Sequence, residues 1–338
     1  MTVKAADKAH SLQMAESHGD IYNWLFNATA IIHIPVKLFT IYVVASKTTA
    51  KLRFQSYFIL NVLVWNFLAN LLVAFVHVYP AFPSLCFRLS GPLSLPDSEL
   101  FGHIFFALVI ISLINGAVAV CTSFPFRYLM LKCPQIGNSH KKVILVVSAS
   151  LHLIITLIFM ATYMKWPVMY DNYPEPAQLP SRPFLFCLHP NGWQKAVPVL
   201  FLFIGLAIII AIGLLFAVLI FVELYFLREI TSQNTLTLQK RLLWYLVALS
   251  GISLIMGGVP LIVIIFTTFY PKLHYAPPMF LVSTVIAANH GTIYAIVSLA
   301  MMKSYRTAVE QMVHRLFKLL KTSVKMTQSV TPVVTKLK

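Results

Sequence analysis

Seven long apolar stretches dominate this chain of 338 residues and restrict what it can fold into. A bilayer core about 30 Å thick is crossed by a helix of about 20 apolar residues, because a helix satisfies its own backbone hydrogen bonds. We therefore predict an all-α membrane protein, built as a seven-transmembrane helix bundle. The expected spans are Tyr22–Ser46, Phe54–Tyr79, Phe101–Phe126, Val143–Trp166, Ala196–Leu227, Leu242–Tyr270 and Pro277–Met302.

The composition leaves no room for a separate soluble domain. Hydrophobic residues make up 59% of the chain and charged residues 11%, whereas soluble domains average about 45–50% and 25%. No apolar run precedes Ile21, so we expect the first span, and not a cleavable signal peptide, to direct insertion. The expected layout is an extracellular N-tail (1–21), a receptor domain (22–302), an amphipathic juxtamembrane helix (303–325) and a flexible cytoplasmic tail (326–338).

The distribution of basic residues predicts that the N-terminus lies outside the cell. Of the 26 Lys and Arg residues, 18 fall in segments that this orientation places inside, seven fall outside, and Lys37 lies within the first span. Basic residues near span ends mark the cytoplasmic side. The net charge of +16 therefore indicates an inner face that attracts anionic lipids and acidic partners rather than nucleic acid. Membrane topology by itself also accounts for most of this charge.

The four cysteines are divided between the two sides of the membrane. Cys86 and Cys187 fall in the first and second outer loops, the compartment in which disulfides persist, so we expect them to be bonded. Cys121 lies deep in the third span and is expected to pack as a small apolar residue. Cys133 on the inner side is either an idle thiol or an acylation site.

The second outer loop, between Pro167 and Lys195, alternates prolines with aromatic residues. Proline fixes the backbone and aromatic rings supply contact area. The loop is therefore either a semi-rigid lid over a ligand pocket or a simple connector.

The segment after the seventh span shows helical amphipathicity. Apolar side chains from Tyr305 to Leu320 fall on one face, and His314, Lys318 and Lys321 fall on another. This pattern is typical of a helix that lies on the membrane surface. We expect it on the inner leaflet, in contact with membrane lipids.

Polar residues within the spans have structural as well as functional interpretations. Lys37 either extends its ammonium to the membrane surface or makes a structural hydrogen bond. The asparagines of spans two, three and seven are expected to hold helices together. Pro260 follows Gly257 and Gly258 in the sixth span, which predicts a hinge or a static bend there.

The sequence contains no signature of catalysis. Zinc motifs, nucleophile elbows and phosphate loops are absent, so we expect no enzyme activity, no cofactor and no metal. A transporter is disfavoured because the sequence has no internal repeat and almost no acidic residue in mid-membrane.

Three short motifs resemble nematode serpentine chemoreceptors of the Str superfamily, nearest to class I and class H. They are His33-Ile34-Pro35-Val36-Lys37-Leu38-Phe39 with Tyr42, Pro125-Phe126-Arg127-Tyr128, and Asn289-His290-Gly291-Thr292 followed by Ser304-Tyr305-Arg306. The pattern of the seventh span is the most specific of the three, and the resemblance covers nearly the whole chain. In contrast to rhodopsin-like receptors, Phe126 precedes Arg127-Tyr128 where those receptors have an acidic residue, and Asn-Pro-x-x-Tyr is missing.

The resemblance implies a chemosensory receptor in the plasma membrane, on the cilia of sensory neurons, that binds a small molecule and activates a heterotrimeric G protein. We expect G-protein coupling at Arg127, Tyr128, Tyr305 and Arg306, although Arg127 could also serve to set topology. Pro260, His290 and Gly291 are the expected switch or hinge residues. The alternatives are a seven-span ligand-gated cation channel, which in insect chemoreceptors has its N-terminus inside, and a small-solute transporter.

Overall fold

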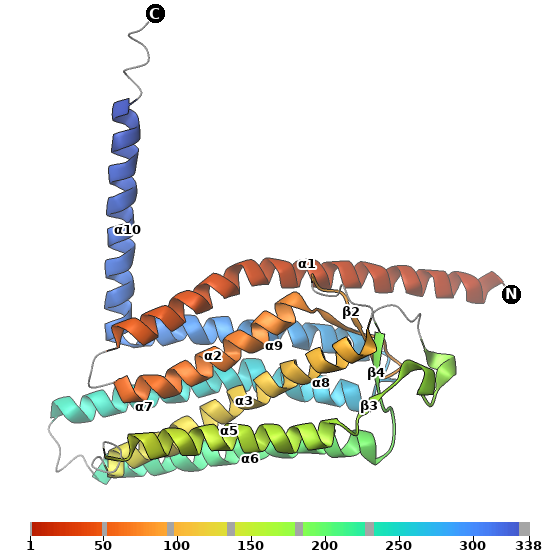
Figure 1. Ribbon diagram of the computed structural model, residues 1–338, viewed down its shortest axis with the longest axis horizontal. Coiled ribbons are helices and arrows are strands. Elements are labelled where there is room, and N and C mark those ends of the chain that lie inside the picture. Colours follow the sequence, from red (N-terminus) through yellow and green to blue (C-terminus); the bar gives the residue numbers. More distant parts are fainter. Residues whose placement is uncertain are drawn as a thin grey trace, which may run out of the picture.

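The computed structural model describes residues 2–48, 53–92, 98–133, 139–179, 185–226 and 233–330. Within these ranges, seven helical segments are long and apolar enough to cross a membrane. They run side by side as one bundle (Figure 1), which confirms the predicted fold. The segments are Gly19–Lys47, Arg53–Phe75, Glu99–Lys132, Lys141–Tyr163, Trp193–Phe226, Gln239–Phe269 and Ala276–Met301.

Each span is built from one helix, except the sixth. The single helices are α1 (Thr2–Lys47), α2 (Arg53–Phe75), α3 (Glu99–Lys132), α5 (Lys141–Tyr163), α6 (Trp193–Phe226) and α9 (Ala276–Met301). The second span ends earlier than the sequence predicts, because the chain enters a strand at Val78. The third continues beyond Phe126 to Lys132, with Pro125 inside the helix.

The seven spans differ in how deeply they are buried. In an apolar stretch of 18 residues in α9, half of the residues are buried inside the protein. In the corresponding stretches of α5 and α6 only 6% are buried. Helix α9 therefore lies at the centre of the bundle, and α5 and α6 lie at its periphery. The exposed apolar side chains of α5 and α6 suit contact with lipid, the solvent in which such residues are stable.

A four-stranded antiparallel sheet, absent from the sequence-based prediction, covers one end of the bundle (Figure 1). Its strands are β1 (Val78–Pro80), β2 (Cys86–Leu89), β3 (Pro167–Val168) and β4 (Leu185–Leu188), in the order β1-β2-β4-β3. Cys86 on β2 is paired in register with Cys187 on β4, and the two form a disulfide. The sheet thus joins the loop after α2 to the loop after α5, and we call this end of the bundle the sheet end.

Helix α3 begins beside this sheet with a side-chain cap. The Ser98 hydroxyl oxygen accepts a hydrogen bond from the Phe101 amide at 3.4 Å, which satisfies one free donor of the first turn. Glu99 in that turn accepts a hydrogen bond from the Tyr170 amide at 3.1 Å. Tyr170 opens the short 3-10 helix η2 (Tyr170–Asn172), so the second loop is anchored to the start of the third span.

The sixth span is interrupted where the sequence predicts a bend. It consists of α7 (Gln233–Ile252), the π-helical segment η4 (Ser253–Gly258) and α8 (Val259–Phe269). Pro260 lies in the first turn of α8, where its missing amide hydrogen costs least. The wide turns of η4 therefore replace the regular α-helix immediately before the proline.

Helix α10 (Lys303–Val330) leaves the other end of the bundle and points away from the spans (Figure 1). Met302 has an extended backbone and separates α10 from α9. Tyr305 and Ala308 are buried against the bundle, whereas Phe317 and Leu319 are exposed. We call this end the α10 end; the N-terminus lies beyond the sheet end (Figure 1).

Candidate functional site

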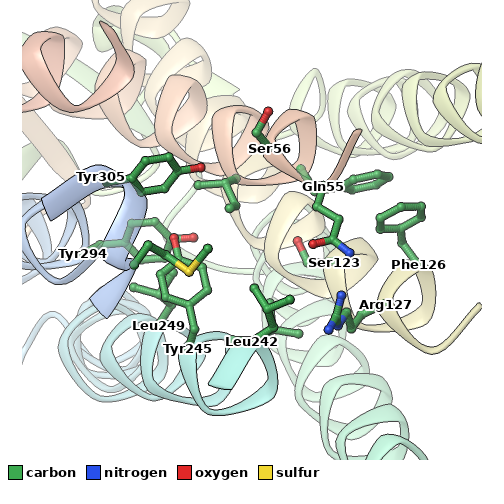
Figure 2. Close-up of a pocket in the computed structure, with 14 residues that line it drawn as sticks. Gln55, Ser56, Ser123, Phe126, Arg127, Leu242, Tyr245, Leu249, Tyr294 and Tyr305 are labelled. Atoms are coloured by element: carbon green, nitrogen blue, oxygen red, sulfur yellow. The ribbon is translucent and has the colours of Figure 1, made fainter. Parts of the chain in front are cut away.

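A small cavity lies among the helices at the α10 end. Its volume is about 50 Å³, and residues of α2, α3, α7, α9 and α10 line it. Figure 2 shows Tyr245, Tyr294 and Tyr305 on one side of this cavity and Phe126 and Arg127 on the other. Pockets for drug-sized ligands occupy roughly 300–1,000 Å³, so the cavity is too small for such a ligand in this arrangement. We call it the α10-end cavity.

Arg127, which lines this cavity, connects the third and sixth spans. Its guanidinium donates a hydrogen bond to the side-chain oxygen of Gln239 on α7, and the residue is only 7% exposed. Among the described residues no carboxylate forms an ion pair with Arg127. A guanidinium has five donors in a rigid fork and readily exchanges one acceptor for another. The contact with Gln239 is therefore a polar link that can open without leaving a buried ion pair broken.

Tyr128, the next residue, faces a different part of the bundle. Its hydroxyl accepts a hydrogen bond from Lys132 at 3.2 Å, and its ring meets that of Phe216 on α6 edge-on. Lys132 also lies 3.8 Å from Glu223 of α6. Tyr128 thus belongs to the interface between the third and fifth spans and does not line the α10-end cavity.

Tyr305 and Arg306 also have separate environments. The Tyr305 hydroxyl lies 3.0 Å from the hydroxyl of Thr48, just beyond the end of α1, and the ring lines the α10-end cavity. Burial raises the pKa of the Tyr305 hydroxyl above its ordinary value. Arg306 is exposed on α10. Of the four predicted coupling residues, the cavity therefore brings Arg127 and Tyr305 together.

Several cavity residues were not identified from the sequence. Tyr245 and Tyr294 line the cavity on the side opposite Arg127 (Figure 2), and Gln239, which is not part of the lining, is the acceptor for Arg127. Tyrosines within apolar spans are common and carry no spacing signal. Only the relative rotation of the helices directs these rings into one cavity.

The predicted hinge residues of α9 are packed tightly against the first and sixth spans. The His290 ring lies against Gly257 of η4, where an added Cβ would be 3.4 Å from it. A Cβ on Gly291 would be 2.5 Å from the Lys37 ammonium nitrogen and 3.0 Å from the side-chain oxygen of Asn66. Gly291 therefore provides the space that Lys37 occupies.

Lys37 is enclosed by the bundle rather than extended to the membrane surface. It is 1% exposed and donates a hydrogen bond to the backbone oxygen of Asn66 at 3.3 Å. Among the described residues it has no carboxylate partner. A lone buried cation is costly unless polar groups surround it, so the fit between Lys37, Asn66 and Gly291 fixes how the first, second and seventh spans meet.

Aromatic rings fill the bundle beneath the sheet. We call this set the aromatic cluster: Phe87, Phe106, Tyr163, Trp166, Phe186 and Phe280. His103 meets the ring of Phe186 edge-on, and both of its ring nitrogens are buried without a hydrogen-bond partner among the described residues. The Trp166 indole nitrogen is also buried without a hydrogen-bond partner among the described residues. Unpaired buried polar groups of this kind are rare and suit a ligand that can pair with them.

The described residues contain no group of three His, Cys, Asp or Glu side chains placed to hold a metal ion. Polar features among the described residues include the α10-end cavity, the packing around Lys37 and the aromatic cluster with its unpaired polar groups. Each is built from residues of several spans. Such an arrangement can respond to a change in helix packing.

Comparison with known proteins assigns the chain to a family. None of the curated proteins matches it. The family model described as serpentine type 7TM GPCR chemoreceptor Srh matches residues 17–315, a range that contains all seven spans and the first part of α10. This agrees with the resemblance to class H of the Str superfamily. The chain is a multi-pass membrane protein that belongs to the Srh family of serpentine seven-transmembrane chemoreceptors.

Proposed function

We propose that this receptor binds a small molecule at the sheet end, outside the cell, and activates a heterotrimeric G protein at the α10 end. The observation that carries the proposal is the link between Arg127 and Gln239, which joins the third and sixth spans beside the α10-end cavity. Breaking this link frees α7 to move away from α3. The cavity would then widen enough to admit a segment of the partner protein.

The orientation rests on charge. The segments that the sequence assigns to the inner side carry 18 of the 26 basic residues, as expected for a cytoplasmic face. The disulfide of the sheet end belongs in an oxidising compartment. An exposed basic face with the apolar side chains of α10 beside it suits both anionic lipid and an acidic surface of a G protein.

The aromatic cluster is the proposed place for the ligand. A small molecule that pairs with His103 or the Trp166 indole would relieve the cost of leaving these groups unpaired. Phe280 of the cluster belongs to α9, and α9 contacts η4 and α8. Repacking of these rings would therefore shift α9 against the sixth span and bias the link between Arg127 and Gln239.

Replacing Gln239 by leucine is expected to raise basal nucleotide exchange about tenfold. A hydrogen bond to a charged group contributes about 1.5–3 kcal/mol, and about 1.4 kcal/mol changes an equilibrium tenfold. Arg127→Ala should instead abolish exchange if its guanidinium also contacts the partner. The assay measures guanine-nucleotide exchange on purified G proteins with receptor in lipid discs, over a panel of G-protein subtypes and small odorants.

Gln233→Leu is the matched control, since Gln233 is exposed in the first turn of the same helix α7. It should leave exchange unchanged. If Gln239→Leu and Gln233→Leu behave alike, the contact with Arg127 does not restrain the receptor. A properly folded receptor that never promotes exchange with any ligand or subtype would refute the proposed coupling.

The orientation has its own test. An epitope inserted beside Lys8 should be stained by antibody on intact cells, and an epitope after Val330 should be stained only after permeabilisation. The distribution of basic residues predicts this pattern. The reverse pattern would place the sheet end in the cytoplasm and would favour a channel of the insect type.

A further inference from the structure

A second and larger cavity opens on the side of the bundle between α2 and α5. Its volume is about 390 Å³. Tyr57 of α2 and Leu145 of α5 border it, with 48% and 38% of their surfaces exposed toward the lipid side of the bundle. Counted at a rise of 1.5 Å per residue from the start of α2, the cavity extends from roughly 6 Å to 18 Å above the α10 end. We call it the lateral groove; it faces the half of the bilayer nearer the α10 end.

A directed chain of hydrogen bonds ends in this groove. Asn115 of α3 uses its amide nitrogen as a donor to Thr156 and to the Ile111 backbone oxygen. Its amide oxygen therefore accepts from the Nδ1 of His152, at 2.6 Å. His152 is thus protonated on Nδ1 in its neutral form, and its Nε2 accepts from the amide nitrogen of Asn61 at 2.9 Å.

Because Asn61 uses its amide nitrogen as the donor to His152, its amide oxygen remains available as an acceptor. Asn61 lines the lateral groove, and no described residue donates to that oxygen. Water is scarce at this depth in a bilayer, so an unpaired amide oxygen there is costly. The oxygen therefore favours a molecule that brings a hydrogen-bond donor into the groove.

The residues that line the lateral groove indicate that the remainder of the ligand is apolar and uncharged. Trp65 stacks on His152 with ring centroids 5.8 Å apart and, with Tyr57 and Leu145, offers mainly apolar surface. The groove has no charged residue in its lining, so an ionised ligand would remain unpaired. A volume of about 390 Å³ falls within the range of roughly 300–1,000 Å³ typical of small-molecule sites.

One side chain connects the lateral groove to the α10-end cavity. Phe58 lines both. Its ring stacks on Phe126, with centroids 4.0 Å apart and an interplanar angle of 13°, and Phe126 directly precedes Arg127. A molecule in the groove would thus press on the residue that packs beside Arg127.

We propose that the lateral groove binds a lipophilic alcohol dissolved in the bilayer, whose hydroxyl donates to Asn61, and that its occupancy stabilises the closed receptor. The shape of the groove coexists with the link between Arg127 and Gln239, so a ligand that fits this shape favours that arrangement. The effect on signalling rests on the proposed G-protein coupling, whereas binding of the alcohol to the groove is independent of it.

Binding is measured on purified receptor in phosphatidylcholine discs with a long-chain alkanol that carries bromine on its tail. Bromine quenches tryptophan fluorescence on contact. The quenching that is present in wild type and missing in Trp65→Phe is the contribution of Trp65. Saturable quenching of that part is expected with the alkanol. The bromoalkane of equal length without the hydroxyl should bind at least about fivefold more weakly, since one hydrogen bond is missing.

Two variants and one control test the site. Asn61→Leu should weaken alkanol binding by a similar factor, and Ser148→Phe should abolish it by filling the groove. Thr162→Val changes the outer part of the same helix α5 and should have no effect. Equal quenching by alkanol and bromoalkane, or unaltered binding in both groove variants when they unfold at the wild-type temperature, would overturn the proposal.

Two further measurements identify which alcohol occupies the groove and test the effect on signalling separately from binding. Displacement of the alkanol by a sterol added to the discs would identify a bilayer sterol as the occupant, and lack of displacement would identify smaller dissolved alcohols. In the exchange assay, the alkanol should lower basal activity of wild type but not of Asn61→Leu. Asn61-dependent binding to a receptor that never activates a G protein would contradict the proposed function and leave the groove assignment intact.

Discussion

Replacing Cys187 by alanine is expected to remove most of the folded receptor from the cell surface. The disulfide with Cys86 closes an interval of 101 residues, and closing a loop of that size stabilises a protein by about 4–5 kcal/mol through the unfolded chain. Folded proteins have a total margin of roughly 5–15 kcal/mol. The loss also leaves β2 and β4, which carry Phe87 and Phe186 of the aromatic cluster, held together by strand pairing alone. Surface staining and thermal unfolding of the purified protein measure the effect.

The free cysteines provide the controls. Cys121→Ala and Cys133→Ala change a thiol that has no disulfide partner and should retain surface expression. Cys86→Ala should match Cys187→Ala, and the double variant should be no worse than either, because the two residues act as one unit. Normal surface levels of Cys187→Ala would show that strand pairing holds the loops without the bond.

Gly291→Ala is expected to lower the free energy of unfolding by about 1–3 kcal/mol, the usual cost of an extra methyl group in a filled core. The added Cβ would lie 2.5 Å from the Lys37 nitrogen and 3.0 Å from the Asn66 oxygen. A lysine end is flexible, but Lys37 is 1% exposed and has little room to withdraw. Thermal unfolding in detergent or lipid discs reports the loss.

Gly205→Ala is the matched control, since a Cβ there meets no atom within 4 Å. It should be neutral or stabilising, because alanine favours a helix more than glycine does. In a Lys37→Ala background the penalty of Gly291→Ala should disappear, as expected for two residues in contact. A penalty that persists there would place the strain at Asn66 and not at Lys37.

The seven spans could be predicted because length and apolar composition alone define a membrane helix. The strands could not. The segment Cys86–Leu89 has four residues and pairs with Leu185–Leu188, so its pairing depends on a contact remote in sequence. The early end of the second span at Phe75 has the same cause, since the next residues join the sheet.

The candidate site was predicted in part. Arg127 and Tyr305 were identified because they belong to short motifs of the family. Gln239, the partner of Arg127, lies 112 residues away in a helix without any distinguishing motif. Tyr128 and Arg306 are their direct neighbours in sequence but point elsewhere, because successive residues of a helix face directions about 100° apart.

Segment η4 divides the sixth span into two unequal arms. The longer arm, α7, has 20 residues, or about 30 Å at a rise of 1.5 Å per residue, so a tilt of about 10° about η4 displaces its far tip by roughly 5 Å. The short arm, α8, lies on the side of the sheet and would hardly move. Gln239 lies in the half of α7 that is farther from η4, where a tilt about η4 produces a larger displacement. A small change of angle at η4 therefore produces a large displacement at the α10 end, where we propose that the G protein binds.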